Sequence, residues 1–389
     1  MVSISYLRKK PLNIAFIGGG INSAVGYAHF VSARLDGFYN LVAGCFSKNN
    51  QINIETGEKY AIERARIYDS WLDLLNCEKG SVDAIVVLTP IPNHFDVVKE
   101  AISLGFPVIC EKTLTTSLHK TKLINDTIQK NNGRLFLTYN YSGYPMVREL
   151  RSQIALRKLG DLHQIMIEMP QEGYIKSLLK KEEVPVQKWR TIDYEISTIS
   201  LDLGTHLHHL INFITGGSTP LCTVANLTHN GKISNVIDNA NALIKYENNL
   251  LVNAWYSKVA LGHRNGLKIR VFGSEGSAEW YQMNPEILYV TDKYGNSMQF
   301  DRGTSTTFEA SKERYQRFKP GHPGGFIEAY ANIYMDIYNS LSSLNNNEQK
   351  IDTYDCQLIG IEQELISMKL MESIEVSSKT KNWKQLIME

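Results

Sequence analysis

The stretch PLNIAFIGGGINSAVGYAHF, from Pro11 to Phe30, decides the fold of the N-terminal part of the chain. A short apolar run breaks at three consecutive glycines, and apolar residues then resume at helical spacing. A strand, a glycine turn and a helix in this order open a doubly wound α/β sheet. The turn has two interpretations at this point: a phosphate-binding loop, or an ordinary connection between a strand and a helix.

The same alternation continues as far as residue 138. Short apolar runs predict strands at residues 13–17, 39–46, 84–88, 107–110 and 135–138. Longer amphipathic segments between them predict helices at residues 23–35, 51–60, 70–77, 94–104 and 117–130. Such strict alternation predicts an α/β Rossmann domain over residues 1–138, with a parallel, doubly wound sheet and right-handed crossovers.

The pattern changes in residues 139–389. Helices are expected at residues 144–159, 199–214, 326–344 and 352–371, and a strand is expected at residues 163–169. Between residues 221 and 290, strand runs follow one another, separated by turn signals such as Asn230-Gly231 and Asn248-Asn249. Strands in series predict an α+β domain with a large, mostly antiparallel sheet that is open on one face.

Composition limits the classes of partner. The 389 residues include 41 basic and 40 acidic side chains, a formal net charge of +1, so no overall field favours nucleic acid or an acidic membrane. Five scattered cysteines form no CxxC pair, which favours reduced thiols. The chain shows neither a signal-peptide pattern nor an apolar run of 18 residues. We therefore expect a soluble, cytoplasmic protein with a small-molecule partner.

The glycine turn resembles a dinucleotide-binding fingerprint. Gly18 and Gly20 match the first two glycines of the GxGxxG pattern, but Ser23 stands at the third position and Gly26 comes three residues later. Glycine lets the main chain approach a pyrophosphate, which the N–H groups of the following helix then bind. In this interpretation the residues that contact the dinucleotide are Gly18, Gly20, Ile21 and Asn22.

The choice between NAD and NADP is usually decided at the end of the second strand, where an acid binds the ribose of NAD. This strand ends in Cys45-Phe46-Ser47-Lys48, without an acid. Ser47 and Lys48 are expected to contact the cofactor, and they would tolerate a 2′-phosphate. Serine also hydrogen-bonds a ribose hydroxyl, so the sequence leaves the choice between NAD and NADP open.

Two further strand ends carry polar motifs, Thr89-Pro90 with Asn93-His94, and Glu111-Lys112-Thr113. Together with the glycine turn and the antiparallel second domain, they resemble the Gfo/Idh/MocA oxidoreductases, the glucose-fructose oxidoreductase and inositol dehydrogenase family. Thr113 replaces the proline of the family's EKP signature, which leaves the lysine in place. The resemblance implies cofactor contacts from Thr89, Pro90, Asn93, His94, Glu111 and Lys112.

The segment SLDLGTHLHH, residues 200–209, resembles the D-x-G-x-H helix of the same family. Asp202 and His206 are expected one turn apart on one helical face. The resemblance implies that His206 is the acid/base toward a substrate hydroxyl, Asp202 its polar neighbour, and Lys112 a charge-stabilising group. These roles agree with the titration of imidazole near neutral pH and with the stabilisation of an oxyanion by a cation.

The histidines of this segment have two other interpretations. His208 and His209 are candidates for structural histidines. A metal site is the other alternative, but HxHH lacks a matching ligand set elsewhere in the sequence, so we expect no metal.

Aromatic and polar residues in three segments suggest a polyhydroxylated substrate, because rings stack on sugar faces beside groups that bind hydroxyls. The expected substrate residues are Asn140, Tyr141, Tyr144, Trp189, Arg190, His206 and His322. Alternatively, Tyr144 and Trp189 pack between the domains. The segments NYSGYPMVR (residues 140–148) and GHPGGF (residues 321–326) are similar to segments of longer members of the family, and this resemblance implies sugars or cyclitols.

The sequence therefore predicts an NAD(P)-dependent oxidoreductase that oxidises a secondary hydroxyl of a pyranose or cyclitol, or reduces the ketone. The resemblance also implies a homodimer or homotetramer formed through the C-terminal sheet. The alternatives are an NAD-dependent glycosidase that oxidises its substrate transiently, a non-enzymatic dinucleotide-binding regulator, and a metal-dependent lyase or hydrolase. The sequence does not identify the sugar, the reacting carbon or the direction.

Overall fold

The computed structural model describes residues 10–175, 187–231, 233, 235–345 and 358–386. The chain divides into two compact units. The first unit comprises Met1–Leu114, Leu123–Thr138 and Tyr330–Gly360. The second unit comprises Thr115–Lys122, Tyr139–Ala329 and Ile361–Glu389, so each unit is assembled from separate stretches of chain.

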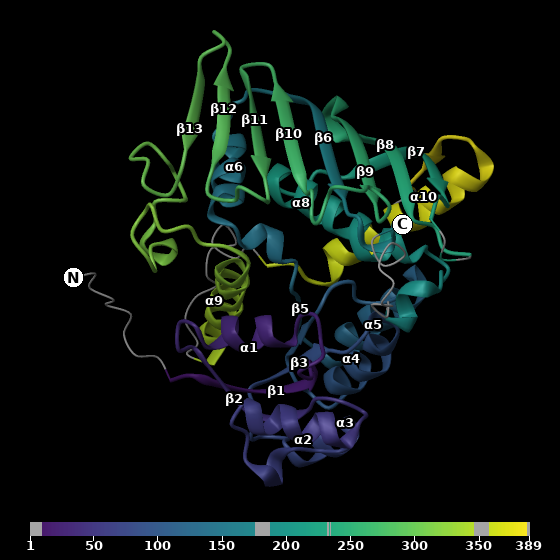
Figure 1. The fold of residues 1–389 in the computed structure, drawn as a ribbon, viewed down its shortest axis with the longest axis vertical. Coiled ribbons are helices and arrows are strands. Elements are labelled where there is room, and N and C mark those ends of the chain that lie inside the picture. The colour runs from purple at the N-terminus through teal and green to yellow at the C-terminus, as the bar shows by residue number, and fades with distance from the viewer. Residues whose placement is uncertain (1–9, 176–186, 232, 234, 346–357, 387–389) are drawn as a thin grey trace. The chain divides into compact units, whose positions relative to one another are not determined.

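The first unit is built on a five-stranded parallel sheet with the order β2-β1-β3-β4-β5 (Figure 1). Its strands are β1 (Leu12–Gly18), β2 (Tyr39–Cys45), β3 (Ala84–Leu88), β4 (Val108–Cys110) and β5 (Leu135–Leu137). Every residue of β3 is buried, as expected for a parallel sheet that is covered on both faces. The predicted α/β class and the five predicted strands are confirmed.

The helices of the alternating segment are α1 (Gly26–Arg34), α2 (Asn50–Lys59), α3 (Trp71–Cys77), α4 (His94–Ser103) and α5 (Leu118–Asn131). Short 3₁₀ turns lie at η1 (Arg64–Arg66) and η2 (Ile91–Asn93). Asn49 and Ser70 cap α2 and α3, because their side chains accept hydrogen bonds from the second or third N–H of the helix. The prediction that the first helix begins at residue 23 is wrong by three residues.

A helix from far along the chain completes the first unit. In α9 (Phe326–Asn345), the residues from Tyr330 onward belong to this unit. Ile333, Tyr334 and Tyr338 lie in one hydrophobic core with Ile14 and Phe16 of β1. A sequence boundary at residue 138 does not include this contribution, because α9 is separated from β1 by about 300 residues of chain.

The second unit contains a nine-stranded sheet with the order β13-β12-β11-β10-β6-β9-β8-β7-β14. Only the central pair β6 and β9 is parallel among the pairs described, and the others are antiparallel. The mostly antiparallel sheet is thus confirmed. The strands are β6 (Leu162–Pro170), β7 (Pro220–Thr228), β8 (Asn239–Tyr246), β9 (Leu251–Ser257), β10 (Lys268–Gly273), β11 (Gly276–Tyr281), β12 (Leu288–Asp292), β13 (Ser297–Phe300) and β14 (Lys384–Gln385).

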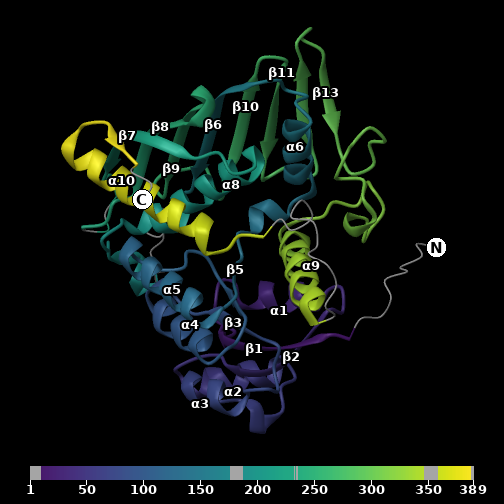
Figure 2. The same cartoon turned by 180° about the vertical axis from the view of Figure 1, so that it is seen from behind.

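One face of this sheet is covered by α6 (Pro145–Ala155), α8 (Thr205–Thr215) and α10 (Ile361–Thr380), which Figure 2 shows in front of the strands. The opposite face carries no helix in the described part of the chain (Figure 1). The remaining short elements are η3 (Asn140–Gly143), η4 (Lys188–Thr191), η5 (Ser200–Gly204), η6 (Glu247–Asn249) and η7 (Glu313–Tyr315). The start expected for the last helix, residue 352, lies outside the described residues. None of the described helices is both long and apolar enough to cross a membrane.

Candidate active site

The glycine turn lies at the carboxyl end of β1, next to the end of β3. Gly18 and Gly19 have φ values of +86° and +76°, which residues with a side chain rarely adopt. A Cβ atom on Gly18 would lie 2.6 Å from the main chain of Leu88 and Thr89. The turn therefore needs glycine both for its conformation and for the close approach of the two strand ends.

Gly26 takes the role that the sequence pattern assigns to position 23. A Cβ atom on Gly26 would lie 2.2 Å from the Gly19 carbonyl oxygen, so only glycine lets α1 pack directly on the turn. The Ser23 hydroxyl accepts hydrogen bonds from the N–H groups of Val25 (3.3 Å) and Gly26 (3.2 Å). Residues 23–25 thus form a short turn before the helix, which explains why the third glycine comes late.

The other predicted contacts of this turn lie near the ends of β1 and β2. A Cβ atom on Gly20 would lie 3.2 Å from the Phe46 carbonyl oxygen. The N–H of Ile21 donates to the Thr56 hydroxyl at 3.0 Å, whereas Asn22 is exposed. Ser47 is half-buried and Lys48 is exposed at the end of β2. The glycine positions therefore fit a dinucleotide, since the main chain is kept free of side chains where a pyrophosphate approaches.

His94 connects two of the predicted motifs. Its side chain is 1% exposed, with Nε2 lying 2.6 Å from the Thr89 carbonyl oxygen and Nδ1 lying 2.9 Å from the Thr113 carbonyl oxygen. Burial lowers the pKa of His94, although both carbonyls act to raise it. The ring thus holds the end of β3 against the residue that follows Lys112. Two further predicted residues lie beside this contact: Pro90 is the N-cap of η2, and Asn93 is its last residue.

Glu111 follows β4 and is buried, at 6% exposed. Its Oε1 atom is bound by His29 Nε2 (2.9 Å), the Thr138 hydroxyl (2.8 Å) and the Tyr330 hydroxyl (2.9 Å). Burial opposes ionisation, but the hydrogen bond and charge of His29, the charge of Lys112 and the Thr138 hydroxyl outweigh it and lower the pKa of Glu111. Lys112 itself is half-buried, and its peptide bond to Thr113 is cis.

In the second unit, the predicted D-x-G-x-H helix begins with a π-helical turn, η5, which continues directly into α8. The helix expected from residue 199 is therefore present, with Ser200–Gly204 in π-helical form. A Cβ atom on Gly204 would lie 2.8 Å from the Met371 sulfur and 3.1 Å from the Tyr256 ring. Glycine is needed here because α10 and β9 pack closely on the turn. Such π-helical turns are frequent at functional sites.

Asp202, on the π-helical turn, is bound by two cations. It forms an ion pair with Arg190, which was predicted as a substrate residue. The Lys258 ammonium lies 2.8 Å from Asp202 Oδ2 and also donates to Gln171 at 2.8 Å. Sequence analysis missed Lys258, although a lysine directly after the alternating strand β9 was a usable signal. Asp202 and Lys258 are buried, at 5% and 7% exposed.

His206 lies between aromatic rings. Its ring centroid is 4.8 Å from that of Tyr141 and 5.7 Å from that of Tyr139, so the structure brings together two of the predicted residues, His206 and Tyr141. The Tyr141 hydroxyl accepts a hydrogen bond from Asn265 at 2.9 Å.

The next two histidines are packed in the interior. His208 contacts the Tyr246 hydroxyl at 3.1 Å, and His209 stacks on Tyr139. Burial lowers the pKa of His208 to about 4 and that of His209 to about 3. Both rings are therefore neutral near pH 7. In the part of the chain that the structure describes, no group of three or more His, Cys, Asp or Glu residues is arranged to hold a metal ion.

The remaining predicted substrate residues differ in exposure. Tyr144 is 2% exposed and packs on Trp280 within the second unit, and Asn140 is 3% exposed. Trp189 is half-buried and stacks under the guanidinium of Arg190, whose carbon lies 4.4 Å from a ring centroid. His322 is exposed. Asn140, Tyr141 and Tyr144 share one short segment, whereas Trp189 and His322 lie on separate loops.

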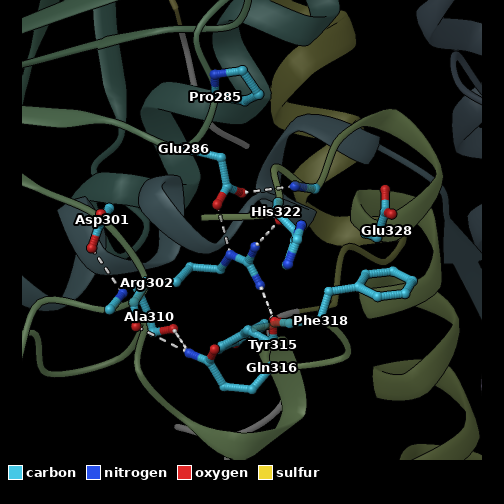
Figure 3. Close-up of polar contacts among 12 residues, drawn as sticks. Pro285, Glu286, Asp301, Arg302, Ala310, Tyr315, Gln316, Phe318, His322 and Glu328 are labelled. Carbon is cyan, nitrogen blue, oxygen red and sulfur yellow. Dashed lines mark hydrogen bonds and ion pairs between the residues drawn. The ribbon is translucent and has the colours of Figure 1, made fainter. Parts of the chain in front are cut away.

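The loop that carries His322 is fixed by a buried arginine that sequence analysis missed (Figure 3). Arg302 is 4% exposed and binds Glu286 at 2.8 Å. It also donates to the carbonyl oxygens of Tyr315 (2.7 Å) and His322 (2.8 Å). The loop between β13 and α9 therefore closes around one guanidinium, which positions His322 through its main chain.

Comparison with known proteins agrees with this arrangement. A family model described as an oxidoreductase family with an NAD-binding Rossmann fold matches residues 12–139, and a model of the GFO/IDH/MocA C-terminal domain matches residues 147–279. The uncharacterized oxidoreductase YfiI of Bacillus subtilis is 27% identical over 352 residues, 88% of each chain. Inositol 2-dehydrogenase of Serratia proteamaculans is 31% identical over 126 residues, 32% of this chain and 35% of that protein.

A solved structure also resembles the whole chain. The inositol dehydrogenase homolog from Azotobacter vinelandii, complexed with NADH and myo-inositol, has a TM-score of 0.87 and 26% identity, covering 96% of this chain and 97% of its own. The fold and the glycine turn thus define an NAD-binding oxidoreductase. The two family models together match more than half of the chain, and the chain belongs to the Gfo/Idh/MocA oxidoreductase family.

Proposed function

We propose that this protein is an NAD(P)-dependent dehydrogenase that interconverts a secondary hydroxyl of a sugar or cyclitol and the corresponding ketone. One observation carries the proposal. The chain has Lys112, Asp202 and His206 in the family's motifs, on a fold that matches an inositol dehydrogenase homolog solved with NADH and myo-inositol. A non-enzymatic regulator would need none of these three side chains.

The first unit has the residues to hold the cofactor. We assign the pyrophosphate to Gly18, Gly20, Ile21 and Asn22, and the adenosine ribose to Ser47 and Lys48. Further contacts are assigned to the segments around Thr89, Pro90, Asn93, His94, Glu111 and Lys112. A bound nicotinamide dinucleotide supplies the hydride acceptor for oxidation, or the hydride donor for reduction.

The catalytic roles follow from the chemistry of three side chains. In the oxidation, the hydroxyl proton passes to His206 while a hydride leaves the same carbon, and a ketone is formed. Lys112 stabilises the negative charge that develops on the oxygen. Asp202 is held by Arg190 and Lys258, which favours a role in orienting these cations rather than in proton transfer. The proposal requires Lys112 and His206 to reach one substrate.

Hydroxyl groups of the substrate are assigned to the polar and aromatic residues of the second unit. Tyr141 supports this assignment because its ring lies against His206, the proposed acid/base. The residues assigned to substrate binding are Asn140, Tyr141, Tyr144, Trp189, Arg190, His206 and His322.

We also propose that a second copy of the chain covers the open face of the nine-stranded sheet, giving a homodimer or homotetramer. This face has a hollow of about 500 Å³ lined by apolar and hydrogen-bonding side chains, including Met166, Leu243, Trp255, Asn241 and Arg270. Mixed surfaces of this kind are typical of protein interfaces. Light scattering coupled to size-exclusion chromatography tests the assembly, and a monomeric mass would contradict it.

The activity is tested by an absorbance screen at 340 nm with NAD or NADP and a panel of sugars and cyclitols. We expect reduced dinucleotide to accumulate with at least one polyol. Consumption of a glycoside without accumulation of reduced dinucleotide would favour the NAD-dependent glycosidase instead. If calorimetry shows dinucleotide binding but no member of the panel reacts, the regulator becomes the better interpretation.

A further inference from the structure

A polar cluster lies in the interior of the first unit. Its members come from distant parts of the sequence: His29 from α1, Glu111 after β4, Thr138 after β5, and Tyr330 and Tyr334 from α9. Their exposed fractions are between 0% and 6%. Burying a carboxylate destabilises a fold unless the carboxylate is paired and hydrogen-bonded. The residues of this cluster therefore hold the Glu111 carboxylate in a defined position.

The hydrogen bonds of the cluster converge on one carboxylate oxygen. Glu111 Oε1 accepts from His29 at 2.9 Å, from Thr138 at 2.8 Å and from Tyr330 at 2.9 Å. On the other side of the imidazole, His29 Nδ1 lies 2.8 Å from the Tyr334 hydroxyl. Glu111 is therefore held by residues from three separate parts of the first unit.

The hydrogen-bond pattern also assigns the tautomer of His29 in its neutral form. The carboxylate only accepts, so the proton lies on Nε2, and Nδ1 accepts from the Tyr334 hydroxyl. Burial raises the pKa of Tyr334 well above its ordinary value, which keeps this hydroxyl protonated as a donor. The Tyr334 carbonyl oxygen in turn accepts from the Tyr39 hydroxyl at 2.9 Å. The imidazole is thus fixed at both nitrogens.

The position of His29 connects this hydrogen-bond network with both the glycine turn and Lys112. His29 is in the first turn of α1, the helix that packs on the glycine turn through Gly26. Glu111 directly precedes Lys112. The contact between His29 and Glu111 therefore joins the helix of the dinucleotide-binding turn to the strand end that carries the proposed catalytic lysine.

We propose that His29 is a positioning residue for Lys112: by binding Glu111, it fixes the strand end after β4 so that the lysine amine is held where hydride transfer requires it. This inference rests on the proposed dehydrogenase function. It predicts that His29 affects the chemical step more strongly than dinucleotide affinity, because the glycine turn itself does not depend on the carboxylate.

The kinetic test compares His29→Leu with His29→Gln, which keeps a donor near the position of Nε2. We expect kcat of His29→Leu to fall on the order of 100-fold, as small misplacements of catalytic groups do. The primary deuterium isotope effect on kcat should rise, dinucleotide affinity should fall by a much smaller factor than kcat, and His29→Gln should recover most of kcat. His208→Leu is the matched control: it also removes a buried histidine and should lower the melting temperature without changing kcat.

A second variant and a second measurement keep the test decisive. Tyr334→Phe removes only the hydroxyl that binds His29 Nδ1, and it should change kcat in the same direction by a smaller factor. Independently of activity, the ¹³C NMR signal of reductively methylated Lys112, assigned through its absence in Lys112→Arg, should shift in His29→Leu and return toward wild type in His29→Gln.

The outcomes separate the two proposals. If the wild-type protein reduces no dinucleotide with any polyol, the proposed function fails, and the Lys112 signal still decides whether His29 positions the lysine. An unchanged Lys112 signal in His29→Leu overturns the positioning role. Equal losses of kcat in His29→Leu and His29→Gln, with an unchanged isotope effect, also overturn it, because they indicate only a damaged core.

Discussion

A buried carboxylate precedes each of the proposed catalytic residues Lys112 and His206 in the sequence, and the two units hold these carboxylates by different means. In the first unit, Glu111 is bound by a histidine and two hydroxyls. In the second unit, Asp202 is bound by two cations, Arg190 and Lys258. The first arrangement keeps one negative charge in a fixed place, whereas the second leaves a net positive charge around the carboxylate. The comparison indicates that hydrogen-bond geometry holds the carboxylate in the first unit, whereas ion pairing holds the carboxylate in the second.

The test with the largest expected effect replaces the proposed catalytic residue that follows each carboxylate in the sequence. We expect Lys112→Ala and His206→Ala each to lower kcat by a factor on the order of 10² to 10⁴, the usual contribution of acid–base and charge stabilisation. The 340 nm assay measures turnover, and fluorescence titration should show that both variants still bind the dinucleotide. Near-normal turnover in both would remove the basis of the active-site assignment.

The second test exchanges each carboxylate for its amide. Asp202→Asn leaves Arg190 and Lys258 without their counter-charge, and we expect it to cost about 3 kcal/mol of unfolding free energy. Glu111→Gln keeps an oxygen acceptor for the histidine and the hydroxyls, so its cost should be about 1 kcal/mol. Urea denaturation measures both values.

A matched control for the second test is Lys258→Met, which removes one of the two cations and keeps the aliphatic length. Because Arg190 still pairs with Asp202, this variant should be less destabilised than Asp202→Asn. If Glu111→Gln proves as costly as Asp202→Asn, the distinction between the two carboxylates is wrong.

Sequence periodicity and a resemblance predicted the fold class, the five parallel strands and the open antiparallel sheet. They could not place α9, because nothing in its pattern shows that Tyr334 and Tyr338 pack beside β1. They also gave no reason for the late Gly26, which became clear only from its 2.2 Å approach to Gly19. Local patterns determine elements, but contacts across about 300 residues depend on three-dimensional packing.

The candidate site was predictable to a similar extent. Lys112, Asp202 and His206 were assigned to the site because they lie in segments that resemble the family's motifs, and their roles stay predictions. His29, Lys258 and Arg302 were missed, because a single charged or titratable residue in an apolar segment has no local signature. Only the folded structure shows that each of them meets a carboxylate.

A third test concerns pH and uses His208, a buried histidine of α8 in the second unit. His208 has a pKa lowered from its ordinary value of 6.5 to about 4, because burial disfavours the charged ring. The folded state therefore binds this proton less readily than the unfolded state. The resulting stability is present above pH 6.5 and is lost as the pH falls from 6.5 to about 4, by at most about 3 kcal/mol.

The variant His208→Asn isolates this contribution, because asparagine does not titrate and can still contact the Tyr246 hydroxyl. The difference in unfolding free energy between wild type and variant, measured by urea denaturation at a series of pH values, should decrease toward pH 4. A difference that stays constant across this range would show that the ring is charged or hydrated in the folded protein.

The last comparison concerns two glycines of the turn in the first unit. Gly26→Ala places a Cβ atom against main chain, 2.2 Å from the Gly19 oxygen, so we expect about 2 kcal/mol of destabilisation. A Cβ atom on Gly20 would lie 3.2 Å from the Phe46 carbonyl oxygen, which is also a tight contact, so Gly20→Val should cost some stability as well. It should in addition weaken dinucleotide binding, since the side chain blocks the approach of the pyrophosphate.

Thermal denaturation and dinucleotide titration separate these two effects, with Gly173→Ala as the control because a Cβ atom there meets nothing within 4 Å. Unchanged affinity in Gly20→Val would mean that the pyrophosphate lies elsewhere on the turn. If Gly20→Val loses more affinity than Gly26→Ala for the same loss of stability, Gly20 belongs to the proposed cofactor site and Gly26 to the packing of the fold.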